Sequence, residues 1–563
     1  MSTDNPTDIQ NKAPKDKKGP KKPSSVDQQT ADQNELDGEV CVDASDSSTE
    51  SPAEQPISLT DLEVGEPIER ERDPLQAASA EITKDVNYQL EDFLSEKDPY
   101  RALLIWLIHI EPLEQRMPGE AIKHWLLREI AYIDELINEQ LNLILHHEKL
   151  QKLEASWRGL AMLCKSAAEF NNTWVKFLDI SWAEVSKDIG RSMEFDQSHL
   201  FHKIYSTEFG MPGGKPYGVI IGDYEISHRP SKNHPYDDIS TLTVLAQVAA
   251  ASFAPYITAA SAEFFGLDNL QEMNGTIQFE KIFQQEEYIK WRAFRDQEDS
   301  RFVGLTLPRV LMRSPYTART TGFHGLNYKE VIDSNDDYCW GNASYAFATV
   351  LIREFGNVGW FSHIRGVPRD YLGGGLVSEL NPYHFKTDKE GIAIKPLSNV
   401  VITDHLERRL SELGLIPACQ CYDTPFLAFH SNQSTQKPKI YDDKEATINA
   451  KLSGMLQHIL CASRFAHFIK VMIRDKTGSF MTADQVQKYI ERWLHTYTSG
   501  SDSGGWDIQA RYPLRDSEVI VRERLDKPGS YSSVIHLKPH YQLDQMVSEL
   551  KLTTELAPMG SRG

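Results

Sequence analysis

A chain of 563 residues with a net charge of −21 at pH 7 is too long for one hydrophobic core, so roughly two to four domains are expected. Its composition, with 40% apolar and 25% charged residues, is that of a globular protein. The acidic balance argues against nucleic-acid binding, because nucleic-acid-binding surfaces are basic. Six scattered cysteines form neither a disulfide framework nor a paired zinc motif, so we expect buried, reduced thiols.

No targeting or membrane-spanning segment is recognisable in the sequence. The N-terminus lacks the apolar core of a signal peptide. The most apolar long stretch, residues 244–265, contains Gln247, Pro255 and Glu263. These residues predict a buried helix that breaks at Pro255 rather than a membrane span. We therefore expect a cytoplasmic protein without membrane insertion.

Residues 1–80 form a low-complexity N-terminal tail with a net charge of −10. Lys, Pro, Asp, Ser, Gln and Glu dominate it, so it cannot bury enough apolar surface to offset the entropy lost on ordering. We predict a disordered acidic tail.

Residues 81–170 are predicted to form a helical N-terminal region. Apolar residues recur at three- and four-residue steps near Leu90–Leu94, over Arg101–Ile110 and over Pro118–Leu150, and again from Leu153 to Leu163. We expect four helices that pack on a partner as well as on one another.

Residues 171–505 are predicted to form a mixed α/β body, because short apolar strands alternate with helices. The predicted strands are Trp174–Leu178, Tyr217–Ile221, Val303–Leu307, Val400–Ile402 and Phe426–Phe429. The predicted helices are Asp238–Phe253, Ala343–Glu354, Asp404–Leu413 and Ala450–Asp475. Such alternation is typical of a partly parallel, mixed sheet.

Residues 506–563 contain a predicted β-hairpin. Two strands, Ser517–Arg524 and Ser530–Lys538, flank the turn sequence Asp526–Gly529. A lone hairpin is only marginally stable, so we expect it to be completed by further strands from this chain or another. The apolar strand residues concerned are Val519, Val521, Ile535 and Leu537.

The segment FGMPGGKPYGVIIGDYE (Phe209–Glu225) is the most distinctive of the chain. It contains Gly-Lys, as a phosphate-binding loop does, but Pro216 follows where the loop needs a hydroxyl, and the motif precedes its strand instead of following one. The segment instead predicts a rigid turn, with φ fixed by Pro212 and positive φ at Gly213 and Gly214. The residues assigned to this structural turn are Gly210, Pro212, Gly213, Gly214, Gly218 and Gly222.

Two sets of side chains are candidates for chemistry. His199 and His202 would share a helix face, where they could hold a metal, but no third ligand lies near. Glu298 and Asp299 are adjacent carboxylates that could act as an acid and a base. Neither set has a recognisable motif around it, so we expect no catalytic residue, no metal and no cofactor.

The segment around Glu298 and Asp299 is rich in arginine and favours a structural role. Its arginines interleave with acids, and arginine is the residue best suited to planar contacts with carboxylates at interfaces. The candidate contacts between subunits are Arg292, Arg295, Glu298, Asp299, Arg301, Arg309 and Arg313.

Taken together, seven segments in register resemble the large subunit of the type VI secretion contractile sheath, the TssC/VipB family. They are Leu153–Leu160, Phe209–Glu225, Trp291–Tyr316, Tyr338–Ala343, Gln436–Ile440, Ser463–Lys470, and Arg511–Arg515 with Leu537–Tyr541. The resemblance extends over residues 120 to 545.

The resemblance implies a structural protein that is not an enzyme. Family members form an obligate heterodimer with a small sheath subunit (TssB/VipA-like), and copies of this pair build hexameric rings around an inner tube on a membrane-anchored baseplate in the bacterial cytoplasm. Contraction drives the tube outward, and a ClpV-like ring ATPase takes the contracted sheath apart. Strands exchanged between protomers mesh the polymer, a form of β-augmentation.

The resemblance and the residue patterns leave three points open. The tail holds no clear copy of the helix through which family members recruit the ATPase; Ile57–Leu62 and Ile82–Leu94 are the candidates. The sheath of a related phage-tail-like injection system is an alternative, and so is an enzyme that uses His199 and His202 or Glu298 and Asp299.

Overall fold

The computed structural model divides the chain into two units, Met1–Arg116 and Met117–Gly563. It describes residues 93–99, 102, 119–232, 234–275, 277–317, 326–368, 372–385, 393–476, 482–500, 505–523 and 531–540. The predicted acidic tail, most of the two first predicted helices, Cys41 and the hairpin turn lie outside these residues. In the first unit, residues 93–95 are helical.

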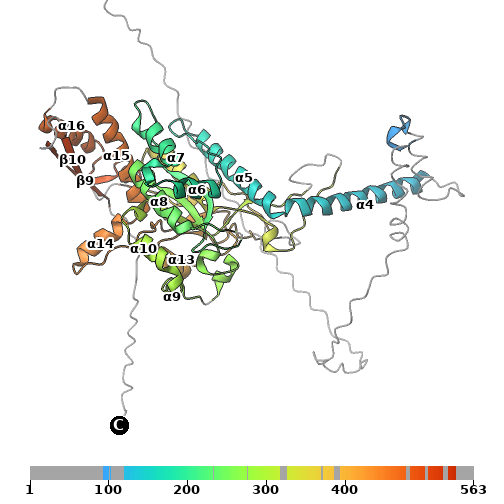
Figure 1. Ribbon diagram of the computed structural model, residues 1–563. Coiled ribbons are helices and arrows are strands. Elements are labelled where there is room, and N and C mark those ends of the chain that lie inside the picture. Colours follow the sequence, from blue (N-terminus) through green and yellow to red (C-terminus); the bar gives the residue numbers. More distant parts are fainter. Residues whose placement is uncertain are drawn as a thin grey trace, which may run out of the picture. The chain divides into compact units, whose positions relative to one another are not determined.

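Two helices open the second unit (Figure 1): α4 (Gly119–Leu145) and α5 (Glu148–Ala168). The prediction of one helix over residues 118–150 is wrong, because the chain turns at His146 and His147. His147 becomes the N-cap of α5, and its side chain accepts a hydrogen bond from the backbone N–H of Lys149 at 3.3 Å.

The body contains the mixed sheet that the sequence predicts. Its strand order is β1-β2-β3-β7-β8-β6. Strands β1, β2, β3 and β7 are parallel, and β8 is antiparallel to both of its neighbours, β7 and β6. The strands are β1 (Ile220–Ile226), β2 (Tyr256–Ala260), β3 (Val303–Leu307), β6 (Leu376–Val377), β7 (Ile416–Gln420) and β8 (Leu427–Phe429). A separate antiparallel pair joins β4 (Val310–Arg313) to β5 (Cys339–Gly341).

Helices cover both faces of the sheet. On β2, Tyr256 belongs to one hydrophobic core and the next residue, Ile257, to the other, as the alternation of side chains along a strand requires. The first core includes residues of α6 (Trp182–Arg191), α8 (Asp238–Ser252), α10 (Ile289–Arg295) and α13 (Asp404–Glu412). The second includes residues of α12 (Ala343–Val358).

Shorter elements connect these helices and strands. They are η1 (Phe195–Gln197), α7 (His199–Phe201), the π-helix η2 (His202–Gly210), η3 (Glu263–Phe265), η4 (Leu270–Asn274), α9 (Phe279–Ile282), η5 (Glu286–Tyr288), η6 (Asp299–Phe302) and η7 (Asn335–Asp337).

Two predicted strands are wrong. Trp174–Leu178 has no strand partner among the described residues, and its aromatic side chains Trp174 and Phe177 are 67% and 61% exposed. Val400–Ile402 is irregular, although Val400 and Ile402 are buried in the first core. An apolar, β-branched segment forms a strand only where a neighbouring strand can pair with its backbone, and neither segment has such a neighbour among the described residues.

The predicted helix over residues 244–265 is also wrong beyond Ser252. Phe253 adopts a φ of 52°, which ends α8, and the chain continues through Pro255 into β2. β2 pairs with β1 on one side and β3 on the other, so tertiary pairing decides its conformation. The predicted strand Tyr217–Ile221 is displaced toward the C-terminus, since β1 begins at Ile220.

The C-terminal region packs around a third hydrophobic core, which contains Trp360, Phe465, Ile490, Leu494, Val519 and Val521 among others. Its elements are α14 (Lys444–Ser453), α15 (Leu456–Lys476), α16 (Ala483–His495), α17 (Trp506–Arg511), β9 (Leu514–Glu523) and β10 (Tyr531–Pro539) (Figure 1). The single helix predicted over Ala450–Asp475 is wrong, because the helix is interrupted at Gly454. The predicted hairpin is confirmed: β9 and β10 pair antiparallel, with Ile535 opposite Val519.

Candidate assembly surfaces

The glycine-rich segment forms a tight turn. The backbone N–H of Gly214 donates to the carbonyl oxygen of Met211 at 3.2 Å, and Gly213 has a φ of +83°, which a side chain rarely permits. The prediction of a positive φ at Gly214 is wrong. A Cβ at Gly214 would instead collide with the carbonyl oxygen of Glu208, so this glycine is needed for close packing.

The surroundings of the turn hold its shape. The carboxylate of Glu208 accepts a hydrogen bond from the backbone N–H of Lys215 at 3.1 Å and pairs with Lys176. The Lys215 ammonium lies 4.0 Å from the ring centroid of Trp174. Farther along, a Cβ at Gly222 would meet the Tyr256 hydroxyl on β2, while Gly210 and Gly218 have ordinary space around them. These contacts position backbone rather than a ligand.

Arg313 on β4 is the centre of a buried ion network. Its Nε lies 2.7 Å from Oε1 of Glu154 on α5, and its Nη2 lies 3.1 Å from Oε1 of Glu330. The side chains of Arg313 and Glu330 are 6% and 1% exposed. Burial opposes ionisation of Glu154, but hydrogen bonds from Arg313 and Arg158 outweigh burial and lower the pKa of Glu154. The network ties α5 to the small β4–β5 sheet.

The other arginines of the segment make different contacts. Arg309 binds Glu225 through two 2.6 Å hydrogen bonds. Arg295, 9% exposed, donates from Nε to the carbonyl oxygen of Thr435 at 2.9 Å, and burial lowers its pKa to about 10. Arg292 donates to the carbonyl oxygens of Phe283 and Gln285. Their partners are thus distant in sequence or are backbone groups, which the local pattern could not reveal.

Arg301, Glu298 and Asp299 remain on the outside of the body. Arg301 and Glu298 form a loose pair at 4.0 Å, and the Glu298 side chain is 74% exposed. Asp299 is half-buried at the start of η6. The Arg309 side chain, at 39%, is more exposed than that of Arg301, at 30%, but Glu225 holds it through two hydrogen bonds, whereas Arg301 and Glu298 form a local pair.

The alternative catalytic residues are not brought together with others. His199 and His202 are both exposed, and Nδ1 of His202 lies 3.1 Å from the Ser206 hydroxyl. Among the described residues, no group of three or more His, Cys, Asp and Glu side chains is placed to hold a metal ion. Cys339, Cys419 and Cys461 are buried as predicted, Cys421 is partly buried, and Cys164 is exposed, contrary to prediction.

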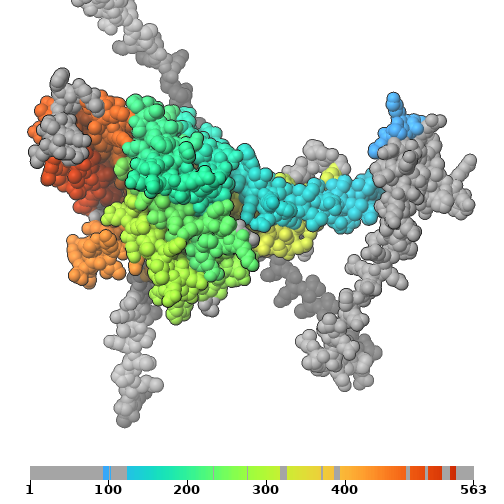
Figure 2. Space-filling model, in the orientation of Figure 1, coloured from blue at the N-terminus to red at the C-terminus, as the bar shows by residue number. Residues whose placement is uncertain are grey.

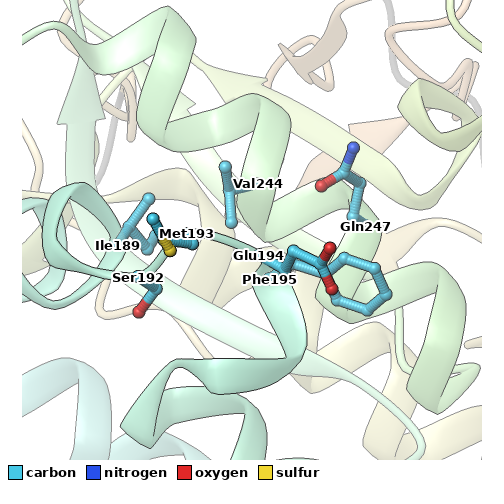
Figure 3. Close-up of a pocket in the computed structure, with 7 residues that line it drawn as sticks. All are labelled: Ile189, Ser192, Met193, Glu194, Phe195, Val244 and Gln247. Carbon is cyan, nitrogen blue, oxygen red and sulfur yellow. The ribbon is translucent and has the colours of Figure 1, made fainter.

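A pocket of about 290 Å³ lies between the end of α6 and α8 (Figure 3). Its lining consists of Ile189, Ser192, Met193, Glu194, Phe195, Val244 and Gln247. Glu194 is the single ionisable side chain in that lining, and none of the predicted site residues contributes to it. The hydroxyl of Ser192 in this lining donates to the carbonyl oxygen of Asp188 at 2.9 Å.

Helix α4 carries the largest row of exposed apolar side chains. Ile130, Ile133, Ile137 and Ile144 follow one another at steps of three, four and seven residues, which places them on one face. They are 40–54% exposed. The opposite side of the helix is held to the body by Asn138 and Asn142, whose side chains bond Asn327 and Tyr328. Figure 2 shows most of the length of α4 uncovered in this view.

A second exposed apolar group was missed by the sequence analysis. Leu153 and Trp157 on α5 are 55% and 58% exposed, and the Trp157 ring lies 6.0 Å from that of Phe177. The pattern of Trp174–Leu178 predicted a strand, but the aromatic side chains of Trp174 and Phe177 are exposed, and Phe177 lies beside Trp157 of α5.

The C-terminal hairpin buries one face within its own chain. Val519 is 1% and Val521 is 9% exposed, and both pack in the third core with the partly buried Ile535 and Leu537. The predicted strand residues are therefore core residues of this chain. Within the described residues the hairpin has two strands. The outer edge of β9 is bridged at Leu514 to Thr498, and the outer edge of β10 has no neighbouring strand there.

Two family models match the chain in succession. The EvpB/VC_A0108 tail sheath N-terminal domain matches residues 128–436, and the EvpB/VC_A0108 tail sheath gpW/gp25-like domain matches residues 445–556. The chain belongs to the TssC/VipB sheath family. The type VI secretion system sheath protein TssC1 of Pseudomonas aeruginosa is 38% identical over 432 residues, which span 76% of this chain and 85% of that protein.

Two solved assemblies show weaker likeness to this TssC/VipB chain. The anti-feeding prophage baseplate structure contains a chain with 11% identity and a TM-score of 0.34, covering 68% of this chain and 84% of that one. The contracted helical sheath of the same system gives 11% identity and a TM-score of 0.27, over 56% of this chain and 67% of that one. These scores are too low to bear on the fold. None of the described helices combines the length and the apolar character needed to cross a membrane.

Proposed function

We propose that this sheath protein is the large subunit of a type VI secretion sheath and assembles with a small, TssB/VipA-like subunit as an obligate heterodimer. The pairs would stack as hexameric rings around an inner tube, and contraction of the polymer would deliver effectors. Family membership supports the sheath role, and the exposed apolar face of α4 supports the need for a partner.

The α4 face is the observation that carries the heterodimer proposal. Its isoleucines repeat with the three- and four-residue spacing of a coiled-coil seam, in which each apolar side chain enters a hole on a facing helix. Exposing such a row to water is unfavourable, since burying one large apolar side chain stabilises a protein by about 1.5–3 kcal/mol. A helix of the small subunit is the occupant that we propose for this seam.

Contacts between copies would use the hairpin and the exposed charged residues. A strand from a neighbouring protomer would add to an open edge of the β9–β10 hairpin and give main-chain hydrogen bonds. Arg301, Glu298 and Asp299 would meet oppositely charged groups of the next protomer. Such head-to-tail contacts generate a helical polymer where the rotation between protomers does not close.

The proposed role is structural, without catalysis, and places the chain in the bacterial cytoplasm on a membrane-anchored baseplate. The inner tube protein and the baseplate are further proposed partners, as is a ClpV-like ATPase that disassembles the contracted sheath.

Co-expression tests this function directly. The chain is produced with the small sheath subunit from its own gene cluster, and the product is examined by negative-stain electron microscopy. We expect tubules with a helical repeat, and a stoichiometric complex of the two chains on purification. Discrete monomers of the large chain in every preparation would overturn the proposal. A gene cluster that encodes a phage-tail-like injection system would assign the tubules to the alternative sheath.

A further inference from the structure

The loop at residues 359–366 packs against the second matched domain of the chain. It belongs to the N-terminal sheath domain by sequence, yet Trp360 is buried in the third core, where its ring stacks on Phe465 of α15 with 4.0 Å between centroids. Farther along the loop, the Ser362 hydroxyl donates to the carbonyl oxygen of Ala510 on α17 at 3.1 Å. The loop is therefore packed against α15 and α17, which belong to the gpW/gp25-like domain.

Glu354 lies beneath this loop as a buried carboxyl group. It is 7% exposed near the end of α12, and its Oε1 has no hydrogen-bond partner. The adjacent Arg353 is committed elsewhere, since it donates to the carbonyl oxygens of Leu376 and Gly374. Burial raises the pKa of Glu354 to about 7 and Asp507 on α17 contributes in the same direction, while Arg353 and the backbone N–H of His363 act against them.

His363 in the loop is a buried base, and its pKa is lowered where that of Glu354 is raised. It is 2% exposed, its Nδ1 has no hydrogen-bond partner, and its ring lies 4.1 Å from the ring of Trp506 on α17. Burial lowers the pKa of His363 to about 4, helped by the nearby His540 at the end of β10. The charged forms of both Glu354 and His363 are thus disfavoured in the closed structure.

We propose that α17 and the β9–β10 hairpin are joined to the sheath body by a releasable seam that buries the side chains of Glu354 and His363, while α15 of the same matched domain stays in the second core. On opening near pH 6, Glu354 gives one proton to water and becomes a carboxylate. His363 takes one proton from water and becomes an imidazolium. Hydration of both ions favours the open state, which an apolar pair would not do.

The seam explains why two polar groups with unsatisfied atoms occupy a domain junction. A junction of apolar side chains alone would gain nothing from contact with water on opening. Here Trp360 supplies the apolar contact that closes the seam, and the Glu354–His363 pair limits its strength. Opening releases one proton from Glu354 and takes up one at His363. The opening equilibrium of the wild type is therefore insensitive to pH between the ordinary pKa values of Glu and His.

Hydrogen exchange of the full-length chain tests the seam through two single variants. In Glu354→Gln, His363 is the member of the pair that still titrates, so we expect the opening of α17 and β10 to become about tenfold rarer for each pH unit raised between 4.5 and 6.5. In His363→Phe, which keeps a ring against Trp506, only Glu354 titrates. Opening should then become about tenfold more frequent per unit over the same range. Rates are divided by the intrinsic exchange rate at each pH, and α8 is the internal control.

Opposite slopes in the two variants, with a nearly flat wild type, support the seam. Equal slopes in all three proteins would overturn it, since a purely structural role of either residue cannot reverse the sign. Asp507→Asn provides a second test at an exposed position. Combined with His363→Phe, it removes the negative charge that helps to raise the pKa of Glu354. The frequency of opening should then stop rising at a lower pH than in His363→Phe alone. An unchanged pH there also contradicts the proposal.

Discussion

Arg313 on β4 and Glu154 on α5 lie 159 residues apart in the sequence, yet Arg313 Nε and Glu154 Oε1 are separated by 2.7 Å. Arg313 also binds Glu330, whose side chain is 1% exposed. A single guanidinium thus joins a helix of the N-terminal region to the loop before β5. Burial lowers the pKa of Arg313, but the hydrogen bonds and charges of Glu330 and Glu154 raise it by more. Loss of Arg313 therefore leaves these two carboxylates without their main partner.

Replacing Arg313 by Met should therefore destabilise the body strongly. Removing one member of a buried ion network leaves an uncompensated charge and costs about 3–5 kcal/mol. Urea unfolding followed by tryptophan fluorescence gives the change. The matched control is Arg408→Met, because Arg408 pairs with Glu412 at 3.5 Å on the surface, where such pairs contribute about 0–1 kcal/mol. Equal effects of the two variants would show that the Arg313 network is unimportant.

The glycine turn offers a second matched pair. Gly214→Ala places a Cβ against the carbonyl oxygen of Glu208, and the backbone there must move. We expect a loss of about 1–3 kcal/mol, as for other overpacked sites. Gly218→Ala meets the Phe361 ring at an ordinary distance of 3.7 Å and should change stability by no more than about 0.5 kcal/mol. Thermal unfolding of both variants measures the difference, and a harmless Gly214→Ala would contradict the close contact.

Much of the fold follows from local sequence. The helices α12 and α13 begin where predicted, because Asn342 and Thr403 are N-cap residues whose side chains accept backbone hydrogen bonds. The segment 174–178 has the composition of a strand but has no strand neighbour in the part of the chain that the structure describes. Strand formation depends on a partner strand from elsewhere in the chain, so composition alone could not exclude a strand at this segment.

The surfaces were less predictable than the fold. The sequence located the arginines, but it assigned their acids to the same segment, whereas Arg309 and Arg313 use Glu225, Glu154 and Glu330. Such pairings depend on how distant elements pack. The periodicity of α4 did show an apolar face, although only its exposure shows that this face is available to another chain.

The row of exposed isoleucines on α4 predicts how heterodimer formation responds to an added charge. Ile137→Lys places an ammonium in the middle of the apolar row and should reduce capture of the small subunit at least tenfold. Glu139→Lys introduces the same side chain two positions away, outside the isoleucine row and beside the exposed Leu136 and Leu143, and should have a smaller effect. Affinity purification from co-expressing cells measures the ratio of the two chains. Equal capture by both variants would remove α4 as the docking helix.

Arg301 tests the contacts between protomers. Its side chain is 30% exposed and its pair with Glu298 is loose, so Arg301→Glu should leave the thermal midpoint within about 2 °C of the wild type. If Arg301 meets an acidic group of the next protomer, the variant should bind the small subunit normally but form fewer or shorter tubules. Counting tubules by negative-stain microscopy separates the two steps. Normal tubules would place Arg301 outside the contact.

His467 on α15 predicts a loss of stability in acid. Its Nε2–H donates to the carbonyl oxygen of Ser252 at 2.9 Å, which joins α15 to the end of α8. Burial lowers the pKa of His467 to about 4, and the charges of Arg464 and Lys470 act in the same direction. The unfolded chain binds the proton near its ordinary pKa of 6.5. The stabilisation is therefore complete above about pH 6.5 and is lost as pH falls toward 4.

His467→Gln should reduce this acid sensitivity, because the amide can still donate to Ser252 but does not titrate. Between pH 6.5 and 4.5 the wild type should lose about 1.4 kcal/mol per pH unit more than the variant. Urea unfolding at pH 7.0, 6.0 and 5.0 measures both proteins. His199→Gln, at an exposed position, is the control and should follow the wild type. If the gap between His467→Gln and the wild type does not change with pH, then His467 is not the buried, neutral base that its contacts describe.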